Sequence, residues 1–499
     1  MFERMGNYDQ AITITREISV DFTEENIAAL FGHEAAEDED IERLKSYYLK
    51  GAIYEQVVND LPIRILVGHK GIGKSALFHV AMAENSAAGR LSLLIKPDDI
   101  AGIGDSEANF LKLIREWKSG ITEIIARKAL ISFGLLRGDW RGKLNEYGGK
   151  FIDFLQSTFK AESYANLTGA KRAVIDDFLN NGKIFVYLDD LDRGWQGNPQ
   201  DVKKLSALLN AVRDLASECK GVCFRISLRS DVYYLVRTSD ESTDKIEGSV
   251  LWYAWSNHEI LAMLAKRVEH FHGRLRTTSE LVALNQNQLS RFLATVMEDV
   301  FHGRGNWKNI PMYRMLMSLV RKRPRDIVKL CTLAARNARA KNMKIIGTEN
   351  FNDVFEEYSQ GRLQDTVNEY RSELPEVERL LLGMKPSREE KKTASGYVYT
   401  TDGLFTKIRN IQQSGVFKFH GGKAADVKDL AAFLYKINFI TARKESGDFI
   451  QRRFFEESRY LSHKFVDFGF DWEVHPAYRW ALQPDSLTEV FDTLRASAD

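Results

Sequence analysis

The sequence predicts an α/β fold in which a parallel sheet carries helices on both faces. Three observations point to it. Apolar runs that suit buried strands alternate with helical stretches through the first half of the chain. A glycine-rich loop directly follows the first of these runs. The second half reads first as helices and then as a mixed, aromatic-rich region, so we expect the sheet to belong to the first half.

Five apolar runs are the expected strands, and most are rich in β-branched or aromatic residues. They lie at 63–67, 91–95, 184–188, 222–228 and 250–254. The stretches 107–181 and 201–217 between them have helical spacing, and from 257 to about 385 we expect helices only. We therefore expect four segments: a helical lead-in at 1–60, an α/β domain at 61–256, a helical lid at 257–365 and a C-terminal domain at 366–499.

The lead-in contains an acidic stretch at 34–40, followed by a helical pattern. The apolar side of that pattern consists of Leu44, Tyr47, Tyr48, Ile53 and Val57. Acids at this place either complement the positive end of a helix or form a cation site.

Composition limits the function classes. The chain has 499 residues, 44% of them apolar and 28% charged, and a net charge of +1. Near-zero net charge argues against a protein that coats nucleic acid. Three cysteines, no secretory signal and no bilayer-spanning run favour a reduced, cytoplasmic compartment and no membrane.

The loop from Gly68 to Ser75 reads G-H-K-G-I-G-K-S and fits the phosphate-loop pattern G-x-x-x-x-G-K-[ST] in full. Its glycines let successive backbone N–H groups turn toward phosphate oxygens, and the next helix adds its positive end. We expect Lys74 to reach the β- and γ-phosphates of ATP and the Ser75 hydroxyl to bind Mg²⁺. The expected nucleotide-binding residues are Gly68, Lys70, Gly71, Ile72, Gly73, Lys74, Ser75 and Ala76.

Carboxylates end the third expected strand, in the sequence Asp189-Asp190-Leu-Asp192-Arg193. Asp189 would hold the metal through water, which is the Walker B role, and Asp190 would orient and deprotonate the attacking water. Neighbouring residues of a strand point to opposite faces of the sheet, so both acids cannot serve one site within the strand. This constraint is relaxed if the strand ends at Asp189. Asp192 and Arg193 are either a structural ion pair or part of a subunit contact.

Two arginines complete the expected site. Arg229 ends the fourth strand, which lies beside the phosphate loop in such sheets, and it is a candidate sensor of the γ-phosphate or else a surface arginine. Residues 321–344 carry nine Lys/Arg against one Asp, and Pro324 suits the first turn of a helix there. Arg325 is the better candidate to reach nucleotide from the lid; a solvated basic face or a nucleic-acid contact is the alternative.

The C-terminal region contains one helical pattern, 427–437, followed by two strand-like runs at 439–443 and 449–453 around Gly447. A helix followed by such a ribbon predicts a winged-helix-like fold. Four basic residues of the ribbon could contact a phosphate backbone: Arg443, Lys444, Arg452 and Arg453. Packing of this module against the ATPase domain is the alternative.

The order of loop, acidic strand, strand-end arginine and R-P-R-D lid resembles the STAND and KAP groups of the AAA+ class of P-loop ATPases. Phe31-Gly32, Ala36–Asp38 and Val474–Arg479 also resemble a bacterial P-loop ATPase family found in defence loci. The resemblance implies an ATP-driven switch, often in antiphage defence, that forms a homo-oligomer in which a neighbour's arginine completes the site. The chain lacks the membrane segments and sensor repeats of many such proteins, so an effector would be a separate polypeptide.

Two rival functions remain at this stage. A DNA-directed ATPase, such as an initiator or loader, would use the C-terminal domain on DNA. A small-molecule kinase would need an acceptor pocket, and nothing in the sequence resembles one. A translation-type GTPase and an ABC ATPase are disfavoured because N-K-x-D and LSGGQ-like motifs are missing.

Overall fold

The computed structural model describes most of the chain. The described residues are 20–104, 109–136, 138–147, 150–161, 169–239, 241–390, 396–446, 449–462, 469–483, 490–491 and 493–494.

A five-stranded parallel sheet lies in the first half, as predicted. Its strands are β1 (Ile63–Val67), β2 (Leu91–Ile95), β3 (Ile184–Leu188), β4 (Val222–Leu228) and β5 (Val250–Trp252). Their order is β2-β3-β4-β1-β5, and every neighbouring pair is parallel. Strands β3 and β4 are buried along their whole length, which explains why they read as continuous apolar runs. The predicted α/β fold class is confirmed.

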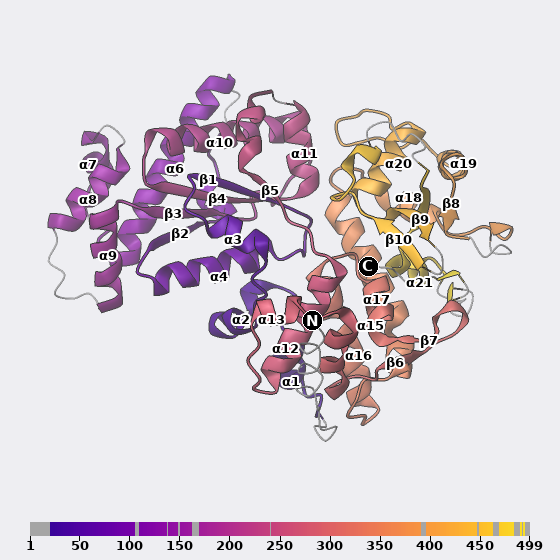
Figure 1. Ribbon diagram of the computed structural model, residues 1–499. Helices are drawn as coiled ribbons and strands as arrows, with labels where there is room; N and C mark the ends of the chain where they lie inside the picture. Colours follow the sequence, from indigo (N-terminus) through magenta and orange to yellow (C-terminus); the bar gives the residue numbers. More distant parts are fainter. Residues whose placement is uncertain are drawn as a thin grey trace, which may run out of the picture.

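Helices cover both faces of this sheet. One face packs on α4 (Lys74–Ala87), and the other packs on α6 (Phe110–Phe133) and α10 (Pro199–Glu218). Between β2 and β3 the chain forms a helical insertion, which lies at the end of the molecule farthest from the C-terminal domain (Figure 1). The remaining helices of this part are α5 (Pro97–Ile100), α7 (Trp140–Glu146), α8 (Phe151–Ala161), α9 (Gly169–Asn181) and α11 (Ser230–Ser239).

The expected helical pattern near the N-terminus forms two helices, with a third before them. They are α1 (Glu24–Phe31), α2 (Ile41–Tyr47) and α3 (Ala52–Val58). The pattern breaks after Tyr47 because Tyr48 takes an extended conformation and Gly51 caps the next helix. Asp40 accepts a hydrogen bond from the Arg43 backbone N–H at 2.9 Å, so the acidic stretch ends in a helix cap.

The lid region consists mostly of helices, but the expectation of helices alone is wrong. A two-stranded antiparallel sheet, β6 (Val300–His302) and β7 (Lys308–Pro311), interrupts it. Gly305 and Asn309 both have left-handed backbones in this segment, and such residues end a helix and allow a tight return. The lid helices are α12 (Asn257–Phe271), α13 (Thr278–Val282), α14 (Gln286–Arg291), α15 (Met312–Leu319), α16 (Pro324–Ala340) and α17 (Thr348–Tyr370).

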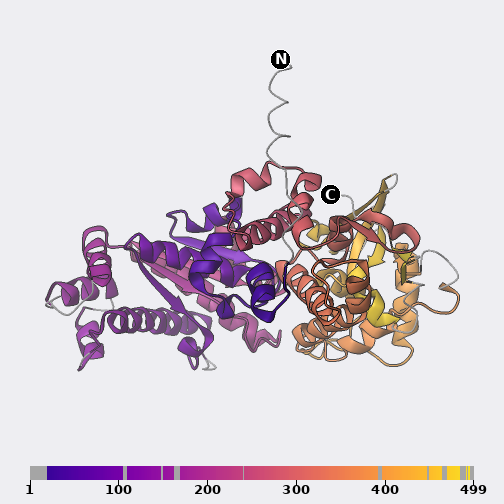
Figure 2. The ribbon, with the colours of Figure 1, turned by 90° about the horizontal axis from the view of Figure 1, so that it is seen from below.

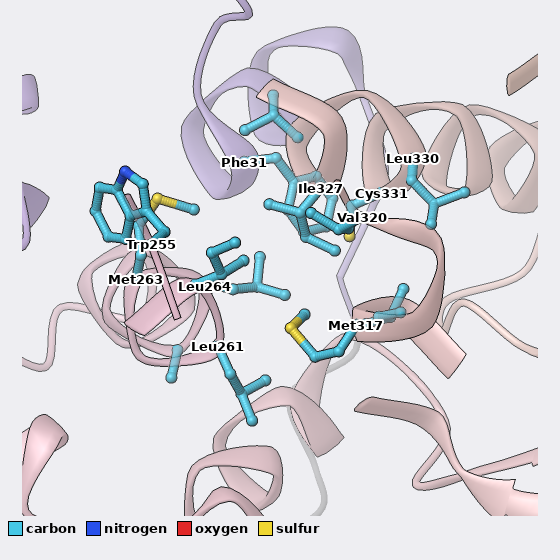
Figure 3. Packing of buried hydrophobic residues seen from close by; sticks show 14 of the residues in the cluster. Phe31, Trp255, Leu261, Met263, Leu264, Met317, Val320, Ile327, Leu330 and Cys331 are labelled. Carbon is cyan, nitrogen blue, oxygen red and sulfur yellow. The ribbon is translucent and has the colours of Figure 1, made fainter. Parts of the chain in front are cut away.

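The N-terminal helices and the lid share one hydrophobic core. Figure 3 shows Phe31 of α1 facing Ile327 and Cys331 of α16, with residues of α12 beside them. Both ribbon views place this shared core between the α/β domain and the C-terminal domain (Figures 1 and 2). The N-terminal segment is therefore part of the lid's packing.

The C-terminal domain contains the predicted helix and hairpin. Helix α20 (Val427–Lys436) precedes β9 (Ile440–Ser446) and β10 (Phe449–Arg453), which pair antiparallel; the turn at 447–448 lies outside the described residues. Two further strands extend the sheet to the order β10-β9-β11-β8. The other elements are α18 (Val377–Gly383), β8 (Val398–Tyr399), α19 (Thr401–Gln412), β11 (Asp471–Val474) and α21 (Arg479–Leu482). Among the described helices, none combines the length and apolar character needed to cross a bilayer.

Candidate nucleotide site

The predicted phosphate loop joins β1 to α4. Its first residue, Gly68, donates a backbone hydrogen bond to the Leu228 carbonyl of β4 at 3.1 Å. Gly71 and Gly73 have φ angles of 79° and 101°, a region that a residue with a side chain enters only at a cost. Helix α4 begins at Lys74. Strand, loop and helix N-terminus thus follow in the order that a phosphate cradle needs.

Lys74 lies inside the curl of the loop. Its ammonium group donates to the carbonyl oxygens of Gly68 at 2.7 Å and His69 at 3.1 Å. Burial lowers the pKa of Lys74, and the carboxylates of Asp192 and Asp189 oppose that shift. The lysine is therefore held at the loop by backbone oxygens and faces the acids across from it.

A cavity of about 600 Å³ opens in front of the loop. Six of the eight predicted loop residues line it, and the Ile72 side chain packs into the hydrophobic core instead. The opposite wall comes from the acidic turn after β3, the start of α16 and the segment 33–39. This volume lies within the usual range for small-molecule sites. The loop and the acidic strand end, which are more than 100 residues apart, meet at this cavity.

Asp189 and Asp190 occupy different positions at the strand end. Asp189 is 6% exposed; one of its carboxylate oxygens accepts hydrogen bonds from the Ser227 hydroxyl and, at 3.0 Å, from the Asp190 backbone N–H. Asp190 has a left-handed backbone with φ of 59°, and its half-exposed side chain pairs with Arg193 at 3.0 Å. The strand ends at Leu188, so alternation does not separate the two acids, and both line the cavity.

Asp192 is the site residue whose place the sequence did not reveal. Arg193 pairs with Asp190, which rules out the first of the two alternatives, an ion pair between Asp192 and Arg193; the subunit contact stays a prediction. Asp192 instead lies in the cavity, 3.5 Å from the Arg229 guanidinium. Burial raises the pKa of Asp192 to about 6, although Arg229 and Lys74 act in the opposite direction. The only signal in the sequence was the third carboxylate of D-D-L-D.

Arg229 lies where the sequence predicted it, beside the phosphate loop. Strand β4 pairs with both β1 and β3, so its end reaches the cavity between the loop and the acids. The guanidinium bonds the Asp231 carboxylate at 3.1 and 2.5 Å and lies 3.9 Å from Glu369 of the lid helix α17. These acids outweigh the cost of burial and raise the pKa of Arg229 well above its ordinary value.

Arg325 connects the lid to the loop. Its backbone N–H donates to the Gly71 carbonyl at 3.3 Å, and its guanidinium donates to the Glu34 carbonyl at 3.2 Å. Pro324 is the first residue of α16, as predicted. Arg325 also lines the cavity, so the structure brings the predicted lid arginine to the nucleotide site.

The other basic residues of 321–344 are engaged by acids of the same chain. Each of the eight has an ion pair within 4.0 Å: Arg321–Asp326, Lys322–Glu457, Arg323–Glu369, Lys329–Glu34, Arg336–Glu24, Arg339–Glu24, Lys341–Asp353 and Lys344–Asp21. The segment that looked strongly basic in the sequence is largely neutralised in the fold. This weakens the alternative of a nucleic-acid contact there.

The predicted Mg²⁺ ligands fit that ion. Ser75 and Asp189 both line the cavity beside the loop, and Asp189 keeps an oxygen for which no hydrogen bond is recorded in the described structure. No cluster of three or more metal-binding side chains occurs among the described residues. Mg²⁺ is usually held by one or two protein oxygens together with phosphates and water, so a hydroxyl and a buried carboxylate are sufficient.

The C-terminal ribbon offers less basic surface than the sequence suggested. Arg452 is buried and donates to Glu473 at 2.8 and 3.2 Å. Arg443 is also buried and pairs with Glu445. Half of the residues of α20 are buried as well, including Leu430 and Phe433. Of the four predicted phosphate contacts, only Lys444 and Arg453 keep substantial exposure.

Comparisons with known proteins match a family model, a protein sequence and several solved structures. The family model described as the FunZ-associated C-terminal helical domain matches residues 259–367, which span the lid from α12 to α17. A putative transposon gamma-delta 80.3 kDa protein of Escherichia coli strain K12 is 22% identical over 522 residues, covering 93% of this chain and 69% of that protein.

Two solved structures are also similar. A Walker-type ATPase of Pyrococcus abyssi is 13% identical with a TM-score of 0.41, covering 89% of this chain and 95% of that chain. The ORC2 protein of Aeropyrum pernix is 12% identical with a TM-score of 0.40, covering 91% and 92%. Because these scores are low, the fold assignment depends on the strand order and the loop described above.

Proposed function

We propose that this protein is a P-loop ATPase of the AAA+ class that works as a molecular switch, with ATP bound between the α/β domain and the lid. One observation carries the proposal. Six of the eight predicted loop residues, three aspartates that follow β3, Arg229 and Arg325 all line one cavity. Phosphate, a divalent ion and an attacking water are the species that this combination of groups recognises.

Each group has a chemical task in this proposal. The amides of the loop and the start of α4 receive the phosphates, and Lys74 exchanges its two carbonyl partners for phosphate oxygens. Ser75 and Asp189 hold Mg²⁺, which supplies charge neutralisation at the phosphates. Asp190 orients the attacking water and takes its proton. Arg229 and Arg325 stabilise charge on the γ-phosphate from the strand side and the lid side.

Closure of the lid on nucleotide would make the site a switch. Arg325 and Glu34 belong to the lid and the N-terminal segment, and both line the cavity with the loop. A bound γ-phosphate would compete with Asp231 and Glu369 for Arg229, and so would change the contact between β4 and α17. By resemblance to STAND and KAP proteins, we propose a homo-oligomer that acts with a separate effector in antiphage defence.

Lys74→Ala tests the proposal directly. We expect the variant to lose MgATP binding and hydrolysis, because its ammonium group is the cation at the centre of the loop. Lys143→Ala, an exposed change on the helical insertion, is the matched control and keeps both. Calorimetric titration with MgADP and a phosphate-release assay are the measurements. Hydrolysis by Lys74→Ala at the wild-type rate would contradict the proposal.

A further inference from the structure

The second residue of the phosphate loop, His69, points away from the nucleotide cavity. Its side chain is 2% exposed and is not among the residues that line that cavity. A smaller space behind the loop contains it, together with Arg323 of the lid and Glu456 of the C-terminal domain. His69 thus links the front of the loop, where its carbonyl oxygen accepts from Lys74, to the interior behind it.

Three parts of the molecule meet at the His69 ring. Nδ1 lies 3.2 Å from the Ser230 hydroxyl, which follows the sensor arginine, and 3.3 Å from the Tyr370 hydroxyl at the end of α17. Nε2 lies in direct contact with the Glu456 carboxylate. The start of α11, the end of α17 and the segment after β10 therefore each supply one polar partner to a single loop side chain.

Glu456 is fixed in place by its own domain. It follows β10 in the chain, its side chain is 6% exposed, and Asn438 donates to its second carboxylate oxygen at 3.1 Å. Asn438 has a left-handed backbone between α20 and β9, and its side-chain oxygen accepts from the Phe455 backbone N–H at 3.1 Å. Burial disfavours the Glu456 anion, but its interactions with His69 and Asn438 lower the pKa of Glu456 to about 2. A charged carboxylate therefore holds the ring.

The loop is braced from behind at a second point. The Trp255 indole N–H donates to the Ile72 carbonyl at 2.9 Å. His69 and Ile72 lie on either side of Lys70 and Gly71, whose segment lines the cavity. With both ends held from behind, the amides between them keep their orientation before nucleotide arrives. A cradle that is already in its binding shape loses less entropy when the anion enters.

We propose that Glu456 is a positioning residue for the phosphate loop: the C-terminal domain holds the loop in its anion-binding shape through His69. Nucleotide binding and docking of the C-terminal domain then favour each other, because coupling between two binding events is reciprocal. This proposal rests on the proposed function, since it needs nucleotide at the loop. It gives the C-terminal domain a regulatory role at the nucleotide site. That role depends on Glu456 and not on the basic residues of the ribbon.

Four single variants and one double variant, which combines Glu456→Ala with His69→Ala, test this coupling in the whole chain. Glu456→Ala and His69→Ala each remove one side of the contact, and Glu456→Gln keeps a hydrogen-bonding side chain of nearly the same shape. Glu457→Ala is the matched control, because Glu457 is the next residue in the chain and pairs with Lys322 of the lid, not with a residue of the loop. Far-UV circular dichroism and melting curves establish that each variant is folded.

Nucleotide affinity is the first readout, measured by calorimetry with MgADP. A buried hydrogen bond to a charged group corresponds to roughly a tenfold or larger change in affinity. We expect Glu456→Ala and His69→Ala to bind roughly tenfold more weakly, Glu456→Gln less so, and Glu457→Ala like wild type. The double variant should be no weaker than either single variant, which a general loss of stability would not produce.

Hydrogen exchange is the second readout, measured first without nucleotide and then with MgADP. Exchange of the 68–75 amides should be faster in Glu456→Ala than in wild type. MgADP should slow exchange at 452–458 in wild type but not in Glu456→Ala. Folded Glu456→Ala and His69→Ala proteins that bind MgADP as tightly as wild type, or more tightly, would overturn the coupling alone. A wild-type protein that binds no MgADP would instead overturn the proposed function.

Discussion

Three aspartates line the cavity, and their exposures differ. Asp190 is half exposed and contacts the exposed Arg193, whereas Asp189 and Asp192 are enclosed. Asp190 is the most exposed of the three, so it is the best placed to meet an incoming water. We therefore expect Asp190→Asn to keep MgATP binding and to slow turnover by at least ~10²-fold, as loss of a general base does. Calorimetry measures MgATP binding, and single-turnover kinetics measure the chemical step. If Asp190→Asn instead lost Mg²⁺-dependent binding, Asp190 would be the metal ligand and Asp189 the base.

Asp192 should appear in the pH dependence of kcat/KM, which reports groups of the free enzyme. Its pKa is raised to about 6 by burial, so below pH 6 the carboxyl is protonated and the cations Lys74 and Arg229 lose a nearby negative charge. We expect kcat/KM to change with pH around 6 in wild type. Asp192→Asn should remove that step while leaving other limbs of the profile in place. A profile with the same step in Asp192→Asn would assign the ionisation to another group.

The residues that the sequence located correctly are those whose chemistry is set by near neighbours in the chain. Spacing within the chain identifies both the loop from Gly68 to Ser75 and the pair Asp189-Asp190. Residues of both segments line the same cavity in the structure. His69 and Glu456 are 387 positions apart, from 69 to 456, and no local pattern marks either one. Contacts of this kind depend on how domains dock, which a single sequence does not display.

At the scale of elements, the start of α16 depends on a buried charge cluster. Asp326 accepts from Arg321 at 2.8 and 2.9 Å and from Arg362 of α17 at 2.9 Å. Burial would raise its pKa, but the arginines hold the pKa of Asp326 well below its ordinary value. Removing one member of a buried ion pair leaves uncompensated charge. We expect Asp326→Ala to lower the free energy of unfolding by about 3–5 kcal/mol.

The matched control for that change lies on the same helix pair. Asp353 of α17 pairs with Lys341 at 2.7 Å, and both side chains are exposed. Asp353→Ala should lower the free energy of unfolding by about 0–1 kcal/mol, which is the usual contribution of an exposed ion pair. Urea unfolding followed by tryptophan fluorescence measures both variants. Equal losses from the two changes would mean that the cluster around Asp326 does not anchor the lid.

Elements were predictable where one pattern governs a long enough stretch. The five strands are apolar runs, and the first is closed by glycine, so each was found from composition and order. Strands β6 and β7 have three and four residues, too few to show alternation inside a helical region. The break between α2 and α3 also escaped, because Tyr48 continues the apolar spacing while its backbone is extended.

At the scale of the whole molecule, buried carboxylates in the C-terminal domain link its stability to pH. Burial opposes ionisation of Glu473, yet Arg452 and Arg479 lower its pKa to about 2 from an ordinary value of 4.5. A carboxyl group whose pKa is lower in the folded than in the unfolded protein stabilises the fold at pH values above its unfolded pKa. That stabilisation is lost as the pH falls from 4.5 toward 2. The melting temperature of the wild-type protein should therefore fall as the pH is lowered through this range. Glu473→Gln should show a smaller pH dependence there, and an unchanged slope would contradict the assignment.

DNA is the remaining candidate partner, and the whole charge distribution bears on it. Net charge is +1, the basic residues of 321–344 are paired within the chain, and Arg443 and Arg452 are buried in ion pairs. The residues of α20 that are not buried include Asp429 as well as Lys428 and Lys436, so that side of the helix has mixed charge. We therefore expect duplex DNA to change the hydrolysis rate by less than about twofold, because acids of the same chain neutralise most cations of the two segments that could contact phosphates. Phosphate release with and without DNA, from low to physiological salt, is the measurement. Strong stimulation that falls steeply with salt would show that the C-terminal domain undocks to expose a basic face, and would favour the DNA-directed ATPase over the switch.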